Sequence, residues 1–197
     1  MRTFVAIDIP GEIRERIQEL IATLRQAPAN VRWTRPEGMH ITLKFLGEVP
    51  TEKVDRVKLA LQSLETAEPV AITIAGAGFF PNERAPRVLW LGIEAGPELG
   101  KLAASVDGSL LSLGIPKEDR PFSPHLTLGR FRDRAGAAPL RNLLKQQETL
   151  AMGSFSAAEF FFYESRLSSG GSIYKRIARY PLALDAREAN STANSPG

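Results

Sequence analysis

The chain has 197 residues, of which 43% are hydrophobic and 24% charged. This composition is that of a globular protein with a full core, and it excludes collagen-like, coiled-coil and wholly disordered chains. There is no cysteine, so disulfides, zinc ribbons, iron–sulfur clusters and thiol nucleophiles are excluded as well. A net charge of +3 allows a surface patch that meets a polyanion but does not require one.

Apolar periodicity divides the chain into strands and amphipathic helices. In chain order, the first half predicts a strand at 3–8, a helix at 10–27, an extended piece at 31–33, a strand at 40–46, a helix at 51–64 and a strand at 70–75. The second half predicts a strand at 87–93, a helix at 97–113, a strand at 125–131, a helix at 139–147, and a closing hairpin of strands at 155–163 and 174–184. Short connections and alternating strands favour antiparallel sheets, and the expected class is therefore α+β.

The pattern gives no sign of secretion or membrane insertion. The first apolar stretch is short and broken by Asp8, so it predicts a strand rather than a signal peptide. No apolar run approaches the roughly 20 residues of a membrane span. We therefore expect a cytoplasmic protein with no membrane partner. Residues 186–197 are small and polar, and they predict a disordered tail after a single domain at 1–185.

The two halves contain matching strings around the only histidines, His40 and His125. Residues 35–43 read RPEGMHITL and residues 120–128 read RPFSPHLTL, so both follow R-P-x-x-x-H-x-T-L at an offset of 85 residues. The same offset aligns residue 5 with residue 90 and residue 70 with residue 155, which predicts that flanking strands also coincide. We infer an internal repeat and two lobes related by a pseudo-twofold axis.

Strand alternation places residues i and i+2 on the same face. His40 and Thr42 therefore share one face, and His125 and Thr127 share the equivalent face of the second repeat. Two facing lobes would bring both imidazoles and both hydroxyls to one central cleft. A lone histidine on a strand is more often a structural hydrogen bonder. The repetition of the same polar face is what favours a functional site.

Two histidines without cysteine supply too few ligands for a closed zinc site, so we expect no metal. Paired imidazoles instead favour general acid–base chemistry, in which one takes a proton from water and the other gives one to a leaving oxygen. Threonine hydroxyls and a cation can hold phosphate oxygens as charge develops. No P-loop, dinucleotide glycine fingerprint or Ser–His–Asp order is present. The pattern predicts phosphodiester cleavage without a cofactor.

At these residues the sequence resembles the 2H phosphoesterase superfamily, which is named for two H-x-T-x motifs. Within it, the sequence is most similar to the bacterial and archaeal RNA 2′,3′-cyclic phosphodiesterases, also called 2′-5′ RNA ligases. The resemblance runs along most of the chain and rests on RTFVAI at 2–7, VRW at 31–33, MHITLKFLG at 39–47, FSPHLTLGR at 122–130, ESRL at 164–167, Tyr174 and YPL at 180–182.

The resemblance implies two α+β lobes, each an antiparallel sheet with helices on its outer face, around a central cleft. It implies hydrolysis of the 2′,3′-cyclic phosphate end of an RNA to a 2′-phosphate without a metal. The sequence itself gives no clear signal for an oligomer, so we expect a monomer. By similarity, His40 is the proton donor to the 3′ oxygen and His125 is the proton acceptor from water. Thr42 and Thr127 would bind the phosphate. The reverse reaction with an RNA 5′-hydroxyl would form a 2′-5′ linkage.

Arg130 fits the extended second motif of the family, H-x-T-x-x-R, as a phosphate contact. Strict alternation places Arg130 on the face opposite His125, unless Gly129 permits a bulge. Lys44 has the parity of His40 and is the alternative cation, whereas Phe45 has core parity. Three aromatic residues are candidates for stacking on a base, although interior or rim positions are favoured for each: Trp33, Phe122 and Tyr174.

Two other functions stay open on the sequence. A non-catalytic module that holds RNA ends would bind cyclic phosphates tightly without turnover. A phosphodiesterase of small cyclic nucleotides would keep the fold and the histidines but accept a mononucleotide as readily as an RNA end.

Overall fold

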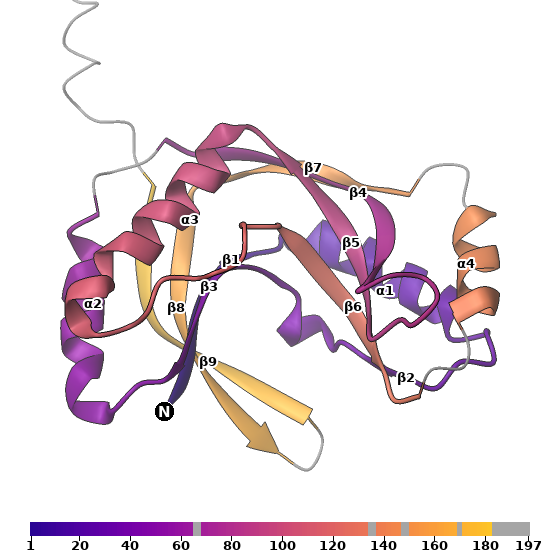
Figure 1. Ribbon diagram of the computed structural model, residues 1–197. Helices are drawn as coiled ribbons and strands as arrows, with labels where there is room; N and C mark the ends of the chain where they lie inside the picture. Colours follow the sequence, from indigo (N-terminus) through magenta and orange to yellow (C-terminus); the bar gives the residue numbers. More distant parts are fainter. Residues whose placement is uncertain (65–67, 134–136, 147–149, 169–170, 183–197) are drawn as a thin grey trace, which may run out of the picture.

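Two antiparallel sheets form the framework of the computed structural model, which describes residues 1–64, 68–133, 137–146, 150–168 and 171–182 (Figure 1). The first sheet has the strand order β3 (His40–Glu48), β1 (Arg2–Asp8), β8 (Glu159–Ser168), β9 (Gly171–Pro181). The second sheet has the order β2 (Val31–Trp33), β6 (His125–Phe131), β5 (Val88–Ala95), β4 (Val70–Phe80), β7 (Ala151–Ala157). The expected α+β class with antiparallel sheets is thereby confirmed. The predicted tail at 186–197 lies outside the described residues.

Each sheet has a pair of helices against it. α2 (Val54–Gln62) contacts β9, and α3 (Pro97–Ser109) contacts β3, so both lie on the first sheet (Figure 1). α1 (Gly11–Leu24) contacts β7 of the second sheet and packs beside α4 (Ala137–Lys145). Short 3₁₀ turns occur at Pro36–Gly38, Thr51–Lys53 and Leu111–Leu113. None of the described helices is long and apolar enough to cross a membrane.

The helix ends follow local signals in the sequence. α1 begins after Pro10 and turns its apolar stripe inward, with Ile13, Ile17, Leu20, Ile21 and Leu24 all buried. Pro97 starts α3, where its missing N–H costs no hydrogen bond. Gly114 has φ 75° and ends the 3₁₀ turn that follows α3, as its lack of a side chain allows.

The two faces of the first sheet pack differently. One face joins the main core with the helices, through fully buried residues such as Val5, Ile7 and Ile41. The other face carries a separate apolar cluster, whose members are Phe4, Ala6, Phe161 and Tyr163, with Tyr174 packed against it. An aromatic surface on the face away from the helices is the setting for His40.

The lobes are not two continuous halves of the chain. The first sheet takes strands from both ends, and α1 follows β1 of the first sheet but packs on the second. The predicted single strand at 155–163 is two strands, because the chain leaves β7 of the second sheet and enters β8 of the first at Ala158. The strand predicted at 70–75 continues to Phe80.

The alignment of flanking strands at an offset of 85 is wrong in detail. Ala6 lies opposite Thr42 in the first sheet, and Trp90 lies opposite Thr127 in the second, so Ala6 rather than Val5 is the counterpart of Trp90. Val70 and Phe155 are not counterparts either, because they belong to β4 and β7, which pair with each other in one sheet. The offset of 85 therefore holds for the histidine strands and not for their neighbours.

Candidate active site

Each histidine begins a strand, and those two strands contact each other where the sheets meet. His40 begins β3 and lies opposite Asp8, and His125 begins β6 and lies opposite Gly92. Both histidine residues are half-buried, while the intervening residues Ile41 and Leu126 are fully buried. Alternation thus turns both histidines away from the core, as the sequence predicts.

A β-bulge follows the threonine in each repeat. In the second sheet, Thr127 pairs with Trp90 and Gly129 pairs with Leu89, so Leu128 is an extra residue in β6. Arg130 then pairs with Val88. Because residues 88 and 90 of β5 share a face, Arg130 lies on the face of Thr127. The bulge that Gly129 permits removes the conflict between Arg130 and strict alternation.

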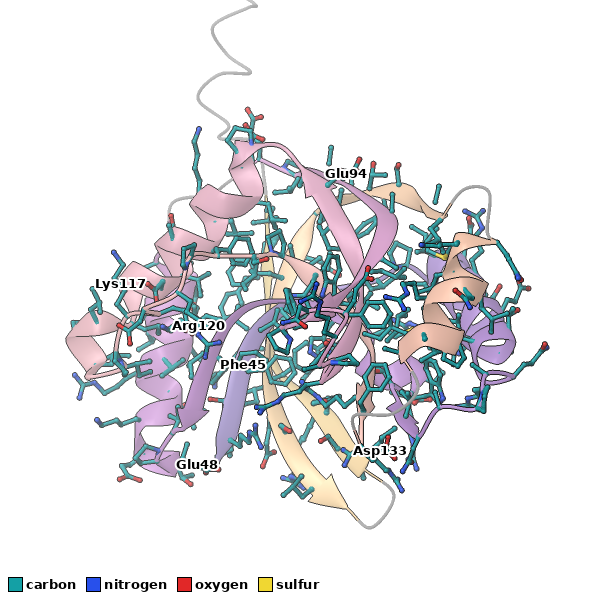
Figure 2. The ribbon with its side chains drawn as sticks, turned by 45° about the vertical axis from the view of Figure 1, so that its right-hand side comes forward. Phe45, Glu48, Glu94, Lys117, Arg120 and Asp133 are labelled. Carbon is teal, nitrogen blue, oxygen red and sulfur yellow. The ribbon has the colours of Figure 1, made fainter. Side chains whose placement is uncertain are left out.

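The same bulge in the first sheet inverts two predicted positions. Thr42 pairs with Ala6 and Lys44 pairs with Val5, so Leu43 is the extra residue in β3. Lys44 is therefore turned to the helix side and is only 4% exposed, and the prediction that it shares the face of His40 is wrong. Phe45 is 57% exposed on the face of His40, against the prediction of a core position (Figure 2). Phe45 and Arg130 occupy equivalent places in the two repeats.

His40 lies within the aromatic cluster. Its ring stacks on Phe4, with the ring centroids 4.6 Å apart, and is nearly perpendicular to the ring of Tyr174, with centroids 5.2 Å apart. Burial of the ring lowers the pKa of His40 from 6.5 to about 4, and the negative charge of Asp8 opposes this shift. His40 is consequently neutral in the free protein at pH 7.

The lowered pKa of His40 predicts a loss of stability in acid. The unfolded chain takes up this proton near pH 6.5 and the folded chain near pH 4, so stability is present above pH 6.5 and is lost as the pH falls toward 4. The expected loss is about 3 kcal/mol. Urea unfolding at pH 7 and pH 4.5 should show a smaller loss for His40→Gln than for His125→Gln, which keeps His40. Equal losses in the two variants would contradict the assignment.

His125 has a different setting. Its Nδ1 lies 2.9 Å from the carbonyl oxygen of Ser123, and its ring is nearly perpendicular to that of Phe80, with centroids 5.0 Å apart. Because a carbonyl only accepts hydrogen bonds, Nδ1 must carry the proton in this contact. The neutral ring then presents the lone pair of Nε2, which is the form that can take a proton from water.

A charged network adjoins His40. The Tyr163 hydroxyl donates to Asp8 at 2.5 Å, and Arg176 donates both to the Tyr163 oxygen at 3.0 Å and to Asp8. The Arg176 guanidinium also lies over the ring of Phe161, 4.4 Å from its centroid. Burial and the bond to Asp8 raise the pKa of Tyr163, so its hydroxyl stays protonated. None of these residues stands out in the sequence, because β1, β8 and β9 bring them together from distant positions.

Lys44, which follows the first histidine motif, bonds to the segment that precedes the second histidine motif. Its ammonium group donates to Asp107 of α3 and to the carbonyl oxygen of Pro116, the latter at 2.8 Å. Asp107 also accepts the backbone N–H of Glu118 at 3.2 Å. The pair is nearly closed to solvent, with 2% of the lysine and 12% of the aspartate side chain exposed. Lys44 therefore has a structural partner of its own.

A family model described as LigT-like phosphoesterase matches the chain twice, at residues 7–90 and 91–174. This chain belongs to the LigT-like phosphoesterase family. The two matches each contain one histidine motif, and together they span both sheets. The resemblance inferred from the paired motifs is confirmed.

The relatives of this family member include two archaeal proteins, both named RNA 2′,3′-cyclic phosphodiesterase. The Archaeoglobus fulgidus protein is 36% identical over 90% of this chain and 98% of its own length. The Methanothermobacter thermautotrophicus protein is 34% identical over 92% of this chain and 99% of its own length. Among solved structures, Escherichia coli LigT complexed with 3′-AMP superposes with a TM-score of 0.75 at 31% identity, covering 93% of this chain and 98% of that one.

The remaining predicted residues of this LigT-like protein divide between core and site. Trp33 and Phe122 are partly buried against the main core, and Tyr174 is the one of the three aromatic candidates that contacts His40. Within the described ranges, no three histidine, aspartate or glutamate side chains gather in a way that could hold a metal ion. The groups at the site are imidazoles, hydroxyls, aromatic rings, arginines and the carboxylate of Asp8.

Proposed function

We propose that the chain hydrolyses the 2′,3′-cyclic phosphate end of an RNA to a 2′-phosphate and a free 3′-hydroxyl. The observation that carries the proposal is the placement of two His-x-Thr motifs on strands β3 and β6, which contact each other between two sheets. The names of the relatives support the same substrate class. The proposal needs no metal, because the two imidazoles supply both proton transfers.

In the proposed reaction, water attacks phosphorus and the bond from phosphorus to the 3′ oxygen breaks. Nε2 of His125 takes the proton from the water, and His40 gives a proton to the departing 3′ oxygen. The hydroxyls of Thr42 and Thr127 and the guanidinium of Arg130 hold the non-bridging oxygens as charge develops. Solvent then returns both histidines to their starting forms, so protons balance over the cycle.

The pKa of His40 bears on its role as donor. A neutral ring in the free protein cannot donate, so the donor must acquire its proton when substrate binds. A bound phosphodiester anion favours the charged imidazole, and Asp8 acts in the same direction. On this proposal, binding of the anionic substrate converts His40 to the protonated form, which can act as the general acid.

Phe45 supports recognition of a nucleic acid end. Phe45 is largely exposed on the catalytic face, and its ring centroid lies 6.1 Å from that of Phe4, which in turn stacks on His40. RNA-binding proteins commonly stack unpaired bases on such rings. We assign Phe45 to the base of the terminal nucleotide. The reverse reaction, in which an RNA 5′-hydroxyl replaces water, follows from microscopic reversibility as a ligase side activity.

The proposal is tested with an RNA oligonucleotide that ends in a 2′,3′-cyclic phosphate, incubated with the protein in excess chelator. We expect complete conversion to the 2′-phosphate, identified by phosphorus NMR. A 3′-phosphate product would contradict the assigned leaving group. Tight binding without conversion would instead support the module that only holds RNA ends.

A further inference from the structure

Two exposed arginines lie side by side on the second sheet. Arg32 of β2 is the direct cross-strand partner of Arg130 of β6, and Arg130 in turn pairs with Val88 of β5. Side chains of directly opposed residues in antiparallel strands point to the same face. Arg32 therefore lies on the face that carries Thr127 and His125.

This pair has no counter-charge among the described residues. Neither guanidinium forms an ion pair or hydrogen bond with any residue in the described part of the chain, whose ion pairs involve other cations. Like charges directly opposite each other destabilise a sheet. Both residues are exposed. Both guanidinium groups are therefore available to bind an anion from solution.

β2 can approach β6 closely because residue 129 of β6, at the bulge, is a glycine. A Cβ atom at Gly129 would lie 2.5 Å from Cγ1 of Val31 and 3.3 Å from the ring of Trp33. Only a glycine lets β2 pair at this position without displacing it. Gly129 thus lets β2 pair closely with β6, which places Arg32 beside Arg130.

We propose that Arg32 binds the phosphodiester that precedes the terminal nucleotide, so that the substrate is the end of an RNA chain rather than a mononucleotide. This inference rests on the proposed function. The cyclic phosphate lies between the histidines, whereas Arg32 is on the edge strand, one strand beyond Arg130. The second phosphate is the anion that a chain offers and a mononucleotide lacks. A planar guanidinium suits it, because it can donate two parallel hydrogen bonds to a phosphate.

The two repeats differ at the position of Arg130, and this difference sets the direction in which the bound RNA chain lies across the two sheets. The position of Arg130 in the second repeat is held by Phe45 in the first, and no arginine pair is formed there. The terminal base is therefore placed on the first sheet, toward Phe45. The preceding phosphate and the rest of the chain extend over the second sheet, toward β2.

The test compares kcat/KM for a dinucleotide that ends in a 2′,3′-cyclic phosphate with that for the nucleoside 2′,3′-cyclic phosphate. Arg32→Gln should lower the dinucleotide value roughly 10- to 100-fold, mainly through KM, and the mononucleotide value less than about twofold. The mononucleotide rate also reports that the variant is folded. The matched control is Arg56→Gln, an exposed arginine of α2 on the outer side of the first sheet, which should change neither value.

A dinucleotide with an uncharged methylphosphonate linkage completes the comparison. With wild-type protein it should lose the same factor as Arg32→Gln does, and the variant should show no further loss with it. Equal losses on dinucleotide and mononucleotide would overturn the inference, because Arg32 would then act on the cyclic phosphate. Unchanged values on both would overturn it too. If wild-type protein hydrolysed neither substrate, the proposed function itself would fail, which is a separate outcome.

Discussion

Replacing His125 by alanine is expected to lower kcat by roughly 10²- to 10⁴-fold, with KM changed little. The group acts on a proton only in the transition state, so its loss does not weaken ground-state binding. His40→Ala should lower kcat to a similar extent. The two histidines act in one step, and the double variant should therefore be no more than about tenfold slower than either single variant.

A sulfur substitution distinguishes the donor from the acceptor. In a cyclic substrate whose 3′ bridging oxygen is replaced by sulfur, the leaving thiolate needs no proton, because thiols are much more acidic than alcohols. His40→Ala should then recover most of its lost rate, whereas His125→Ala should stay slow. Recovery in His125→Ala alone would exchange the two roles. This comparison matters because His40 is neutral in the free protein.

A loss of activity in these variants must be distinguished from a loss of folding. His40 contacts Phe4 and Tyr174, so its truncation to alanine leaves a gap among aromatic rings. His40→Gln retains more of the volume and should show the same loss of kcat. If either histidine variant kept more than a tenth of wild-type turnover while unfolding normally in urea, general acid–base catalysis by that residue would be excluded.

How far the site could be predicted from the sequence depends on the bulges. Strand alternation correctly predicted that four residues point away from the buried residues between them: His40, Thr42, His125 and Thr127. Alternation gave the wrong face for Lys44 and Phe45, which follow the bulge in β3. A register shift arises from pairing with another strand, so it leaves no periodic signal in the sequence of its own strand. Gly129 offered a hint of the bulge in β6. Its counterpart Lys44 offered none.

The assembly of the lobes was the less predictable part. Sequence periodicity identifies an amphipathic helix such as α1 but not the sheet it covers, and α1 packs on the sheet that does not contain the preceding strand. The break at Ala158 was missed for a related reason. β7 and β8 are nearly continuous in sequence, and only their different partners, β4 and β1, separate them. Pairing over long separations determines these features.

Lys44→Met is expected to lower the free energy of unfolding by about 3–5 kcal/mol. The substitution keeps the length of the side chain but removes the ammonium group that bonds Asp107 and Pro116. Asp107 would then be a nearly buried carboxylate with only the Glu118 N–H as a partner. Leaving a charge unpaired in the interior costs far more than an ion pair contributes, because water no longer compensates it.

The double variant Lys44→Met/Asp107→Leu should recover most of this stability, since it removes both charges from the interior. The matched control is Lys58→Met, which breaks the exposed pair of Lys58 with Asp55 on α2 and should change stability by less than about 1 kcal/mol. Urea unfolding of the four proteins measures these differences. A Lys44→Met protein as stable as the Lys58→Met control would show that Asp107 reaches solvent.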